Sequence, residues 1–146
     1  MIVVLAIVCN GYINAQKIAA DKVPAVVLNA FKTKCATAEG VAWEKEGATA
    51  FEAAYKIGKI KHSGTFDQSG KWLETETEME VSALPKPVAD AIAKQYASYK
   101  IKEAVHVETP DKGTFYEADL TKGTKKLEVQ FTAEGKLLNT KKEKGD

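Results

Sequence analysis

The sequence predicts an α+β fold in which a unit of one helix and four antiparallel strands occurs twice. Three observations predict it: an internal repeat, an apolar stripe at helical spacing that opens each copy, and an apolar/polar alternation of period two that follows. One copy of about sixty residues would bury only a marginal core. The two copies are therefore expected to form a single sheet of roughly eight strands, with both helices on one face and the other face open.

The repeat consists of short matches that keep their order along the chain. Val23-Pro24 matches Leu84-Pro85, Phe51-Glu52-Ala53 matches Tyr116-Glu117-Ala118, and Phe66 with Gly70-Lys71-Trp72-Leu73 matches Phe131 with Gly135-Lys136-Leu137-Leu138. These matches place the copies at about residues 23–81 and 84–143, within one domain that covers residues 16–146.

Each copy opens with apolar residues spaced as on one side of a helix. They are Val23, Val27, Ala30, Phe31 and Cys35 in the first copy, and Leu84, Val88, Ala91, Ile92 and Tyr96 in the second. A proline near each start suits a first helical turn, whose N–H groups have no partner within the helix. Each helix is thus expected to pack on the sheet with one side only.

The residues after each helix alternate as in half-buried strands. Phe51, Ala53, Tyr55 and Ile57 alternate with Glu52, Ala54 and Lys56, and the strand at 71–81 alternates Leu73, Thr75, Thr77 and Met79 with Trp72, Glu74, Glu76 and Glu78. Turn signals separate the strands, at Gly47, Gly58, Gly70, Gly113, Gly123 and Gly135. The pattern predicts four antiparallel strands in each copy.

The N-terminal residues have the pattern of an export signal. An apolar run at residues 2–8 is followed by Asn10-Gly11 and by Ala15, a small residue suited to signal peptidase. The run is much shorter than the roughly 20 residues that span a bilayer. We expect cleavage after Ala15 and a periplasmic or secreted protein, the alternative being a buried first strand. The mature chain would keep only Cys35, which we expect to be a small buried hydrophobe.

Composition and spacing argue against several classes of function. The chain has 21 Lys+Arg and 20 Asp+Glu, a formal net charge of +1, so no nucleic-acid partner is predicted. Its two His and two Cys are too few for a zinc site of ordinary spacing. No nucleophile–base spacing and no glycine-rich phosphate loop occurs. We therefore predict no enzyme activity, no cofactor and no membrane span.

Several of these features together resemble one family. The export signal, the Val-Pro-led helix, Val41-x-Trp43, Phe51-Glu52-Ala53 and Phe66-Asp67-x-x-Gly70-Lys71-Trp72-Leu73 look like the PepSY-like family of secreted bacterial proteins, described as beta-lactamase-inhibitor-like. The second copy departs from the pattern, with Val107 for the tryptophan and Thr132 for the aspartate. The resemblance implies a tandem helix-plus-four-strand fold of the beta-lactamase-inhibitor-protein type, without catalytic residues.

The candidate binding residues are apolar side chains whose parity places them on the open face. Trp72, Phe115 and Leu137 are expected to form an exposed patch for a protein or peptide partner, with Glu74 and Glu76 supplying polar steering. The alternative is that these apolar residues shield strand edges or pack on lysine stems. Among the histidines, His62 has core parity and is expected to be buried or half-buried, whereas His106 is expected on the open face.

Two other functions stay open at the level of the sequence. The family shape suggests inhibition of a secreted hydrolase, a peptidase or a beta-lactamase, through a loop at 67–70 or 109–113. The row Glu74, Glu76, Glu78 and Glu80 suggests a site for a cation or a small ligand. Alternate residues of a strand stand about 6.6 Å apart, too far to chelate one ion without another strand, so a solvated face is favoured for this row.

Overall fold

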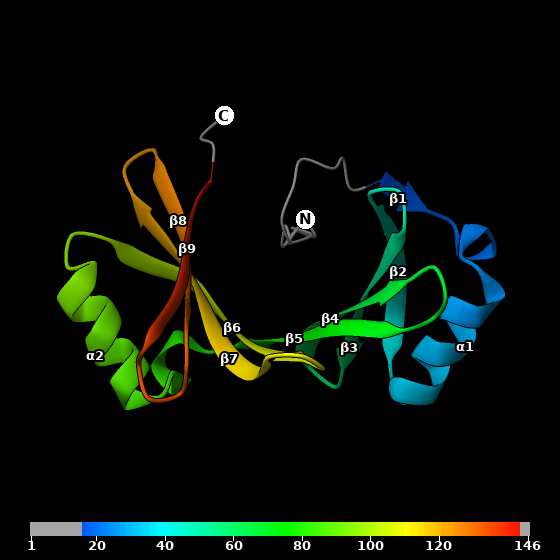
Figure 1. The fold of residues 1–146 in the computed structure, drawn as a ribbon, viewed down its shortest axis with the longest axis horizontal. Helices are drawn as coiled ribbons and strands as arrows, with labels where there is room; N and C mark the ends of the chain where they lie inside the picture. The colour runs from blue at the N-terminus through cyan, green and yellow to red at the C-terminus, as the bar shows by residue number, and fades with distance from the viewer. Residues whose placement is uncertain (1–15, 144–146) are drawn as a thin grey trace. The chain divides into compact units, whose positions relative to one another are not determined.

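Residues 16–143 are described in the computed structural model (Figure 1). The predicted signal peptide, residues 1–15, lies outside the described residues. No helix within residues 16–143 is both long enough and apolar enough to cross a membrane.

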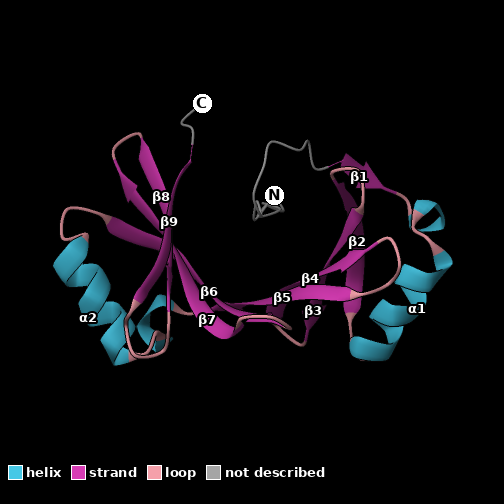
Figure 2. Ribbon diagram, viewed as in Figure 1, coloured by secondary structure: helices cyan, strands magenta, loops and turns pink. Residues whose placement is uncertain are grey.

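The described strands form one antiparallel sheet whose order follows the chain from β1 to β9 (Figure 2). The elements are β1 (Gln16–Ile18), α1 (Ala25–Lys34), β2 (Glu39–Glu46), β3 (Ala50–Ile57), β4 (Ile60–Asp67), β5 (Trp72–Met79), α2 (Lys86–Gln95), β6 (Lys100–Thr109), β7 (Gly113–Lys122), β8 (Lys125–Phe131) and β9 (Leu137–Glu143). The prediction of a single antiparallel sheet is confirmed. The strand beyond the expected eight is β1, whose three residues are too few to show alternation.

The chain divides into two compact units, the first ending at Thr75 and the second beginning at Glu76. The sequence repeat instead assigned the whole strand at 71–81 to the first copy. The boundary falls inside β5 because the two ends of this strand pack against different cores: Trp72 packs against the first core and Met79 against the second, as does Val81 just beyond the strand. Val81 itself begins a 3₁₀ helix, Val81–Ala83, that precedes α2.

The core of the first unit is aromatic and is centred on Phe31 of α1. The rings of Trp43, Tyr55 and Phe66 meet the Phe31 ring edge-on, with centroids at 5.2, 5.3 and 6.2 Å. Such edge-to-face pairs are a favoured arrangement of aromatic rings. Trp43 lies opposite Ala53 in the register of β2 and β3, and Ala53 is fully buried. Helix α1 therefore covers the side of its strands that carries these residues.

The core of the second unit is mainly aliphatic. Val88 and Ile92 of α2 pack with Leu120, Val129 and Phe131, and none of these side chains is more than 3% exposed. Directly paired residues on neighbouring strands point to the same side of the sheet. Ala104 pairs with Ala118, and Ala118 pairs with Val129, so these three residues lie on the side of this core. Helix α2 covers this side of β6–β9 (Figure 1).

The two helices end alike. Beyond α1, the N–H of Cys35 donates to the carbonyl of Phe31, and beyond α2 the N–H of Tyr96 donates to that of Ile92, both at 2.8 Å. Each helix also follows a 3₁₀ helix, Ala20–Lys22 or Val81–Ala83, and a proline, Pro24 or Pro85. The middle of each predicted stripe lies on a ten-residue helix, and the two helices end in similar ways. The outer members of the stripes lie just beyond the helix bounds: Val23, Cys35, Leu84 and Tyr96.

The turns before the last strands, Trp72–Met79 and Leu137–Glu143, are also alike. The N–H of Asp67 donates to the carbonyl of Lys71, and the N–H of Thr132 donates to that of Lys136, both at 2.9 Å. Thr132 therefore stands where the first unit has Asp67, as expected. The expected equivalence of Val107 with Trp43 is wrong, because Val107 pairs with Phe115 on the side away from α2.

Candidate functional site

Trp72 does not stand on the open side of the sheet as predicted. Its ring is half-buried and packs against the first core, and Nζ of Lys34, in α1, lies 3.6 Å from the ring centroid. The indole N–H donates to Oγ1 of Thr75 at 2.9 Å. The prediction failed because the alternation along β5 is weak. Of the residues predicted to face the core, only Leu73 and Met79 are strongly apolar, so alternation alone does not determine which side of the sheet Trp72 occupies.

The other two apolar candidates do not form an exposed patch either. Leu137 is half-buried and packs against the second core, so the predicted open face is wrong for it. Phe115 does lie on the side away from α2, since its neighbour Tyr116 packs against that core, but Phe115 is only 3% exposed. Its predicted exposure is therefore wrong, because parity gives a side and not the exposure of the side chain.

The predicted glutamates of β5 differ in exposure. Glu74 is half-buried and Glu76 is 5% exposed, and both have interaction partners, whereas Glu80, just beyond the strand, is exposed. The row is therefore not a uniformly solvated face. Within the described residues, no group of three His, Cys, Asp or Glu side chains is placed to hold a metal ion.

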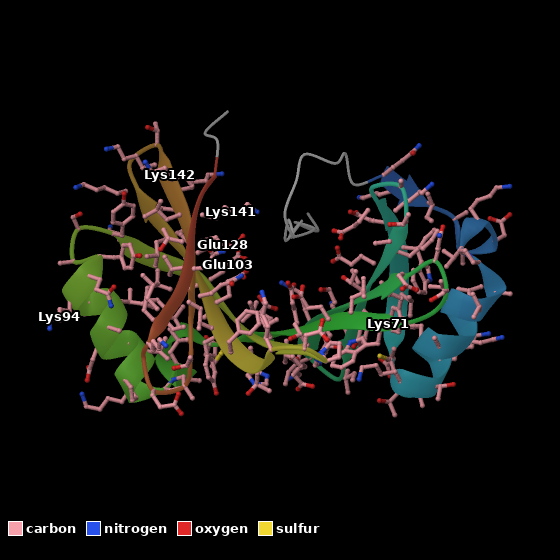
Figure 3. All side chains as sticks on the ribbon, in the orientation of Figure 1. Lys71, Lys94, Glu103, Glu128, Lys141 and Lys142 are labelled. Atoms are coloured by element: carbon pink, nitrogen blue, oxygen red, sulfur yellow. The ribbon has the colours of Figure 1, made fainter. Side chains whose placement is uncertain are left out.

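The side of the second unit away from α2 carries a line of charged residues that crosses four strands. Glu103 of β6 pairs with Asp119 of β7, Asp119 with Glu128 of β8, and Glu128 with Lys141 of β9. We call these four residues the charged row. Figure 3 shows Glu103, Glu128 and Lys141 projecting away from α2, which carries Lys94. Three carboxylates and one ammonium give the row a formal charge of −2.

One ion pair lies within the charged row, and a hydrogen-bonded pair lies beside it. Nζ of Lys141 lies 3.7 Å from Oε2 of Glu128, whose side chain is only 8% exposed. Beside it, Nε2 of Gln130 donates to Oε2 of Glu117 at 2.8 Å, and Glu117 is 5% exposed. A buried carboxylate with a cationic or amide partner keeps a fixed position. The row therefore presents charges at positions set by strand register.

The first unit also carries carboxylates on the side away from its helix. Glu44 of β2 lies directly opposite Glu52 of β3, and both are buried. Burial raises the pKa of Glu52 from 4.5 to about 9, helped by its hydrogen bond with Glu46 and the negative charges of Glu46 and Glu44, while a hydrogen bond with Ser63 opposes the rise. Glu52 thus holds a proton at neutral pH.

The two histidines lie on the helix-covered sides of their units, each beside a tyrosine. His62 is half-buried and stacked on Tyr55 with ring centroids 5.3 Å apart, which confirms its predicted placement. His106 pairs with Tyr116, on the side of α2, so its predicted place on the open face is wrong. Nδ1 of His106 lies 3.8 Å from Oε1 of Glu108.

The charged row was not predicted from the sequence. Its residues lie on strands whose alternation was recognised, but in positions 103, 119, 128 and 141 that are far apart in the chain. A clue was present, because Asp119 and Glu128 alternate with the apolar residues Leu120 and Leu127. Only the register between strands shows that the four side chains form a single line.

Comparison with known proteins gives one family and several similar folds. The sequence model of the family described as "Putative beta-lactamase-inhibitor-like, PepSY-like" matches residues 61–139, more than half of the chain. A BLIP-like protein from Bacteroides fragilis is 27% identical, with a TM-score of 0.73 over 84% of this chain and 89% of that one. No curated protein matches the sequence.

A second solved structure is similar in fold. It is described as that of "putative periplasmic proteins" from Bacteroides eggerthii, and it is 20% identical to this chain. The two align with a TM-score of 0.74 over 82% of this chain and 88% of the other. At this identity the likeness is one of fold, and a shared fold does not by itself carry a function.

Proposed function

The chain belongs to the PepSY-like, beta-lactamase-inhibitor-like family, and from this we propose that it is an exported, non-enzymatic module that binds a protein or peptide. Its periplasmic or secreted location is part of the proposal. The location is supported by the apolar run at residues 2–8 and by the periplasmic description of the Bacteroides eggerthii protein.

We place the binding surface on the charged row of the second unit. This one observation carries the proposal: carboxylates and an ammonium stand in a fixed line on strands, on the side that the helix leaves uncovered. Complementary charges give an interface its register and steer the approach of a partner. The partner should present basic side chains to Glu103 and Asp119 and an acidic or polar group to Lys141.

None of the binding residues predicted from the sequence belongs to the charged row. Trp72 and Leu137 pack against the cores and Phe115 is buried, so none of them serves as an exposed anchor. A steering role of Glu74 and Glu76 remains a prediction, and of these two Glu74 is the more exposed.

We also propose that the two units descend from one duplicated unit. The matched hydrogen bonds at the helix ends and in the turns at 67–71 and 132–136 support this. So does the order of elements, in which a 3₁₀ helix, an α-helix and four strands follow one another in each half. The placement of both helices on one face of the sheet stays a prediction.

A capture experiment with two matched variants tests the binding surface. The double variant Glu103→Gln/Asp119→Asn removes two charges of the row with little change in volume. The control Asp21→Asn/Asp90→Asn removes two charges at exposed positions elsewhere. From the envelope fraction of the native cells, we expect the row variant to retain about one tenth of the partner that the wild type retains. Equal capture by both variants would exclude the charged row.

Inhibition of a secreted hydrolase is the second candidate function, favoured by the description of the family. Of the two loops predicted for this role, 67–70 is unsuited because Gly70 lies against the first turn of α1, with its Cβ position 3.0 Å from the Val26 carbonyl. The loop at 109–113 is the better candidate, since Pro110 to Gly113 are exposed. Purified chain should then inhibit a beta-lactamase or a peptidase, and Asp111→Ala/Lys112→Ala should weaken that inhibition.

A further inference from the structure

The tip of the β3–β4 hairpin carries apolar side chains that belong to neither core. Ile57 and Ile60 pair directly across the hairpin and are 40% and 50% exposed. Gly58 and Lys59 form the turn between them. On the neighbouring strand β2, Val41 is 38% exposed. The first unit thus places exposed aliphatic side chains at the end of a hairpin.

The hairpin turn does not require these isoleucines. The β7–β8 hairpin of the second unit turns in the same way, through Gly123 at φ 59°, as Gly58 is at φ 61°. There the paired residues that flank the turn are Lys122 and Lys125. Since the same turn closes with two lysines, Ile57 and Ile60 are not needed for its geometry. The exposed side chains of Ile57 and Ile60 are therefore free of a role in the turn and can contact another surface.

Lysines surround the apolar tip. Lys59 lies in the turn itself, and Lys56 pairs directly with Lys61 across the strands. Like charges placed opposite one another on a sheet are unfavourable by themselves. Lys61 has an interaction partner and Glu39 of β2 pairs with Lys56, so Lys56 and Lys59 against this one glutamate leave a formal charge of +1 at the tip. This arrangement is complementary to an anionic surface.

We propose that the tip of the β3–β4 hairpin docks on a membrane surface that carries anionic headgroups. Ile57 and Ile60 enter the boundary between headgroups and acyl chains, while Lys56 and Lys59 contact the headgroups. Apolar side chains beside lysines are the combination that binds proteins peripherally to anionic bilayers. A protein partner fits less well, because a stable protein interface covers about 800 Å² on each partner, more than a two-residue tip offers.

This inference is independent of the charged row, which lies on β6–β9. Loss of the partner described above would leave membrane docking intact, and loss of membrane docking would leave the capture of that partner intact. The two proposals can therefore fail separately.

Vesicle sedimentation of the full chain tests the inference. Wild type should sediment with vesicles of phosphatidylglycerol and phosphatidylcholine and much less with phosphatidylcholine alone, and added salt should weaken the binding. The variant Ile57→Ser/Ile60→Ser should bind about tenfold more weakly. The control Val26→Ser/Leu138→Ser, which alters side chains that are 48% and 47% exposed elsewhere, should bind as wild type does.

The apolar run at residues 2–8 is common to all these variants, so a contribution from it cancels in the comparison. A site-specific measurement completes the test. In the variant Ile60→Trp, brominated lipids should quench the added indole, while the fluorescence of the wild type changes little. Equal sedimentation of the tip variant and the wild type, or no quenching at position 60, would overturn the proposal. A dimer seen by light scattering and lost in the tip variant would overturn it in favour of a second copy.

Discussion

Trp72 illustrates, at the scale of one residue, how little a weak alternation says about the two sides of a strand. In β5 the threonines and glutamates outnumber the apolar residues, so parity could place Trp72 on either side. Its contacts with the first core and with Lys34 place it on the side of α1. An indole packed in this way contributes to stability through its buried area and through the lysine above it.

We expect Trp72→Ala to lower the stability of the protein. The substitution removes the ring that packs on the first core, and the expected loss is about 2 kcal/mol for a half-buried large side chain. Thermal or denaturant unfolding measures it, with Leu138→Ala as the control, because Leu138 is 47% exposed. If both variants unfolded like the wild type, Trp72 would not belong to the core.

Glu52 makes the free energy of unfolding depend on pH. Its pKa is about 9 in the folded protein and 4.5 as an ordinary glutamate, so between these values the folded state holds a proton that the unfolded state has released. Stability is therefore greatest below pH 4.5 as far as this group is concerned, and it falls as the pH rises through the window.

The expected fall in unfolding free energy between pH 5 and pH 8 is on the order of 4 kcal/mol, because almost all of this window lies between the two pKa values. Glu52→Gln should remove this slope and be more stable than the wild type at pH 8, because the amide keeps a neutral side chain. Chemical denaturation at several pH values measures both effects. The same slope in the variant as in the wild type would show that another group causes it.

At the scale of elements, contacts between turns and helices determine how strongly a side chain at a turn glycine would destabilise the fold. Gly135 has φ 81°, and a Cβ at this position would overlap the carbonyl oxygen of Pro87 at the start of α2. Gly113 has φ 70°, but its Cβ position has no atom within 4 Å. Both positions strain a side chain through the backbone, and only Gly135 adds a collision with a helix.

We therefore expect Gly135→Ala to be much more destabilising than Gly113→Ala. The second variant should lose about 1 kcal/mol from backbone strain alone, whereas the first should lose more than twice as much, because α2 and the turn must move apart. Gly70→Ala should fall between them, since its Cβ position is 3.0 Å from the Val26 carbonyl. Denaturant midpoints rank the three variants, and equal losses would contradict the packing of turn against helix.

Much of the element structure could be predicted from the sequence because two independent signals agree there. Apolar stripes and prolines mark α1 and α2, and the six glycines expected in turns all adopt positive φ. The open-face residues were predicted less well. Phe115 has the parity expected of it and yet is buried, and the charged row depends on strand register. A single sequence contains neither the exposure nor the register directly.

For the whole molecule, the central claim is that the helix covers one side of the second unit's strands and that the charged row on the other side meets a partner. Carboxyl footprinting with a carbodiimide and an amine, read by mass spectrometry, tests this claim directly on the free and the captured protein. The account predicts that binding protects Glu103 and Asp119 from labelling, while Asp90 on α2 is labelled equally in both states. Protection of Asp90 with unchanged labelling of Glu103 and Asp119 would contradict it.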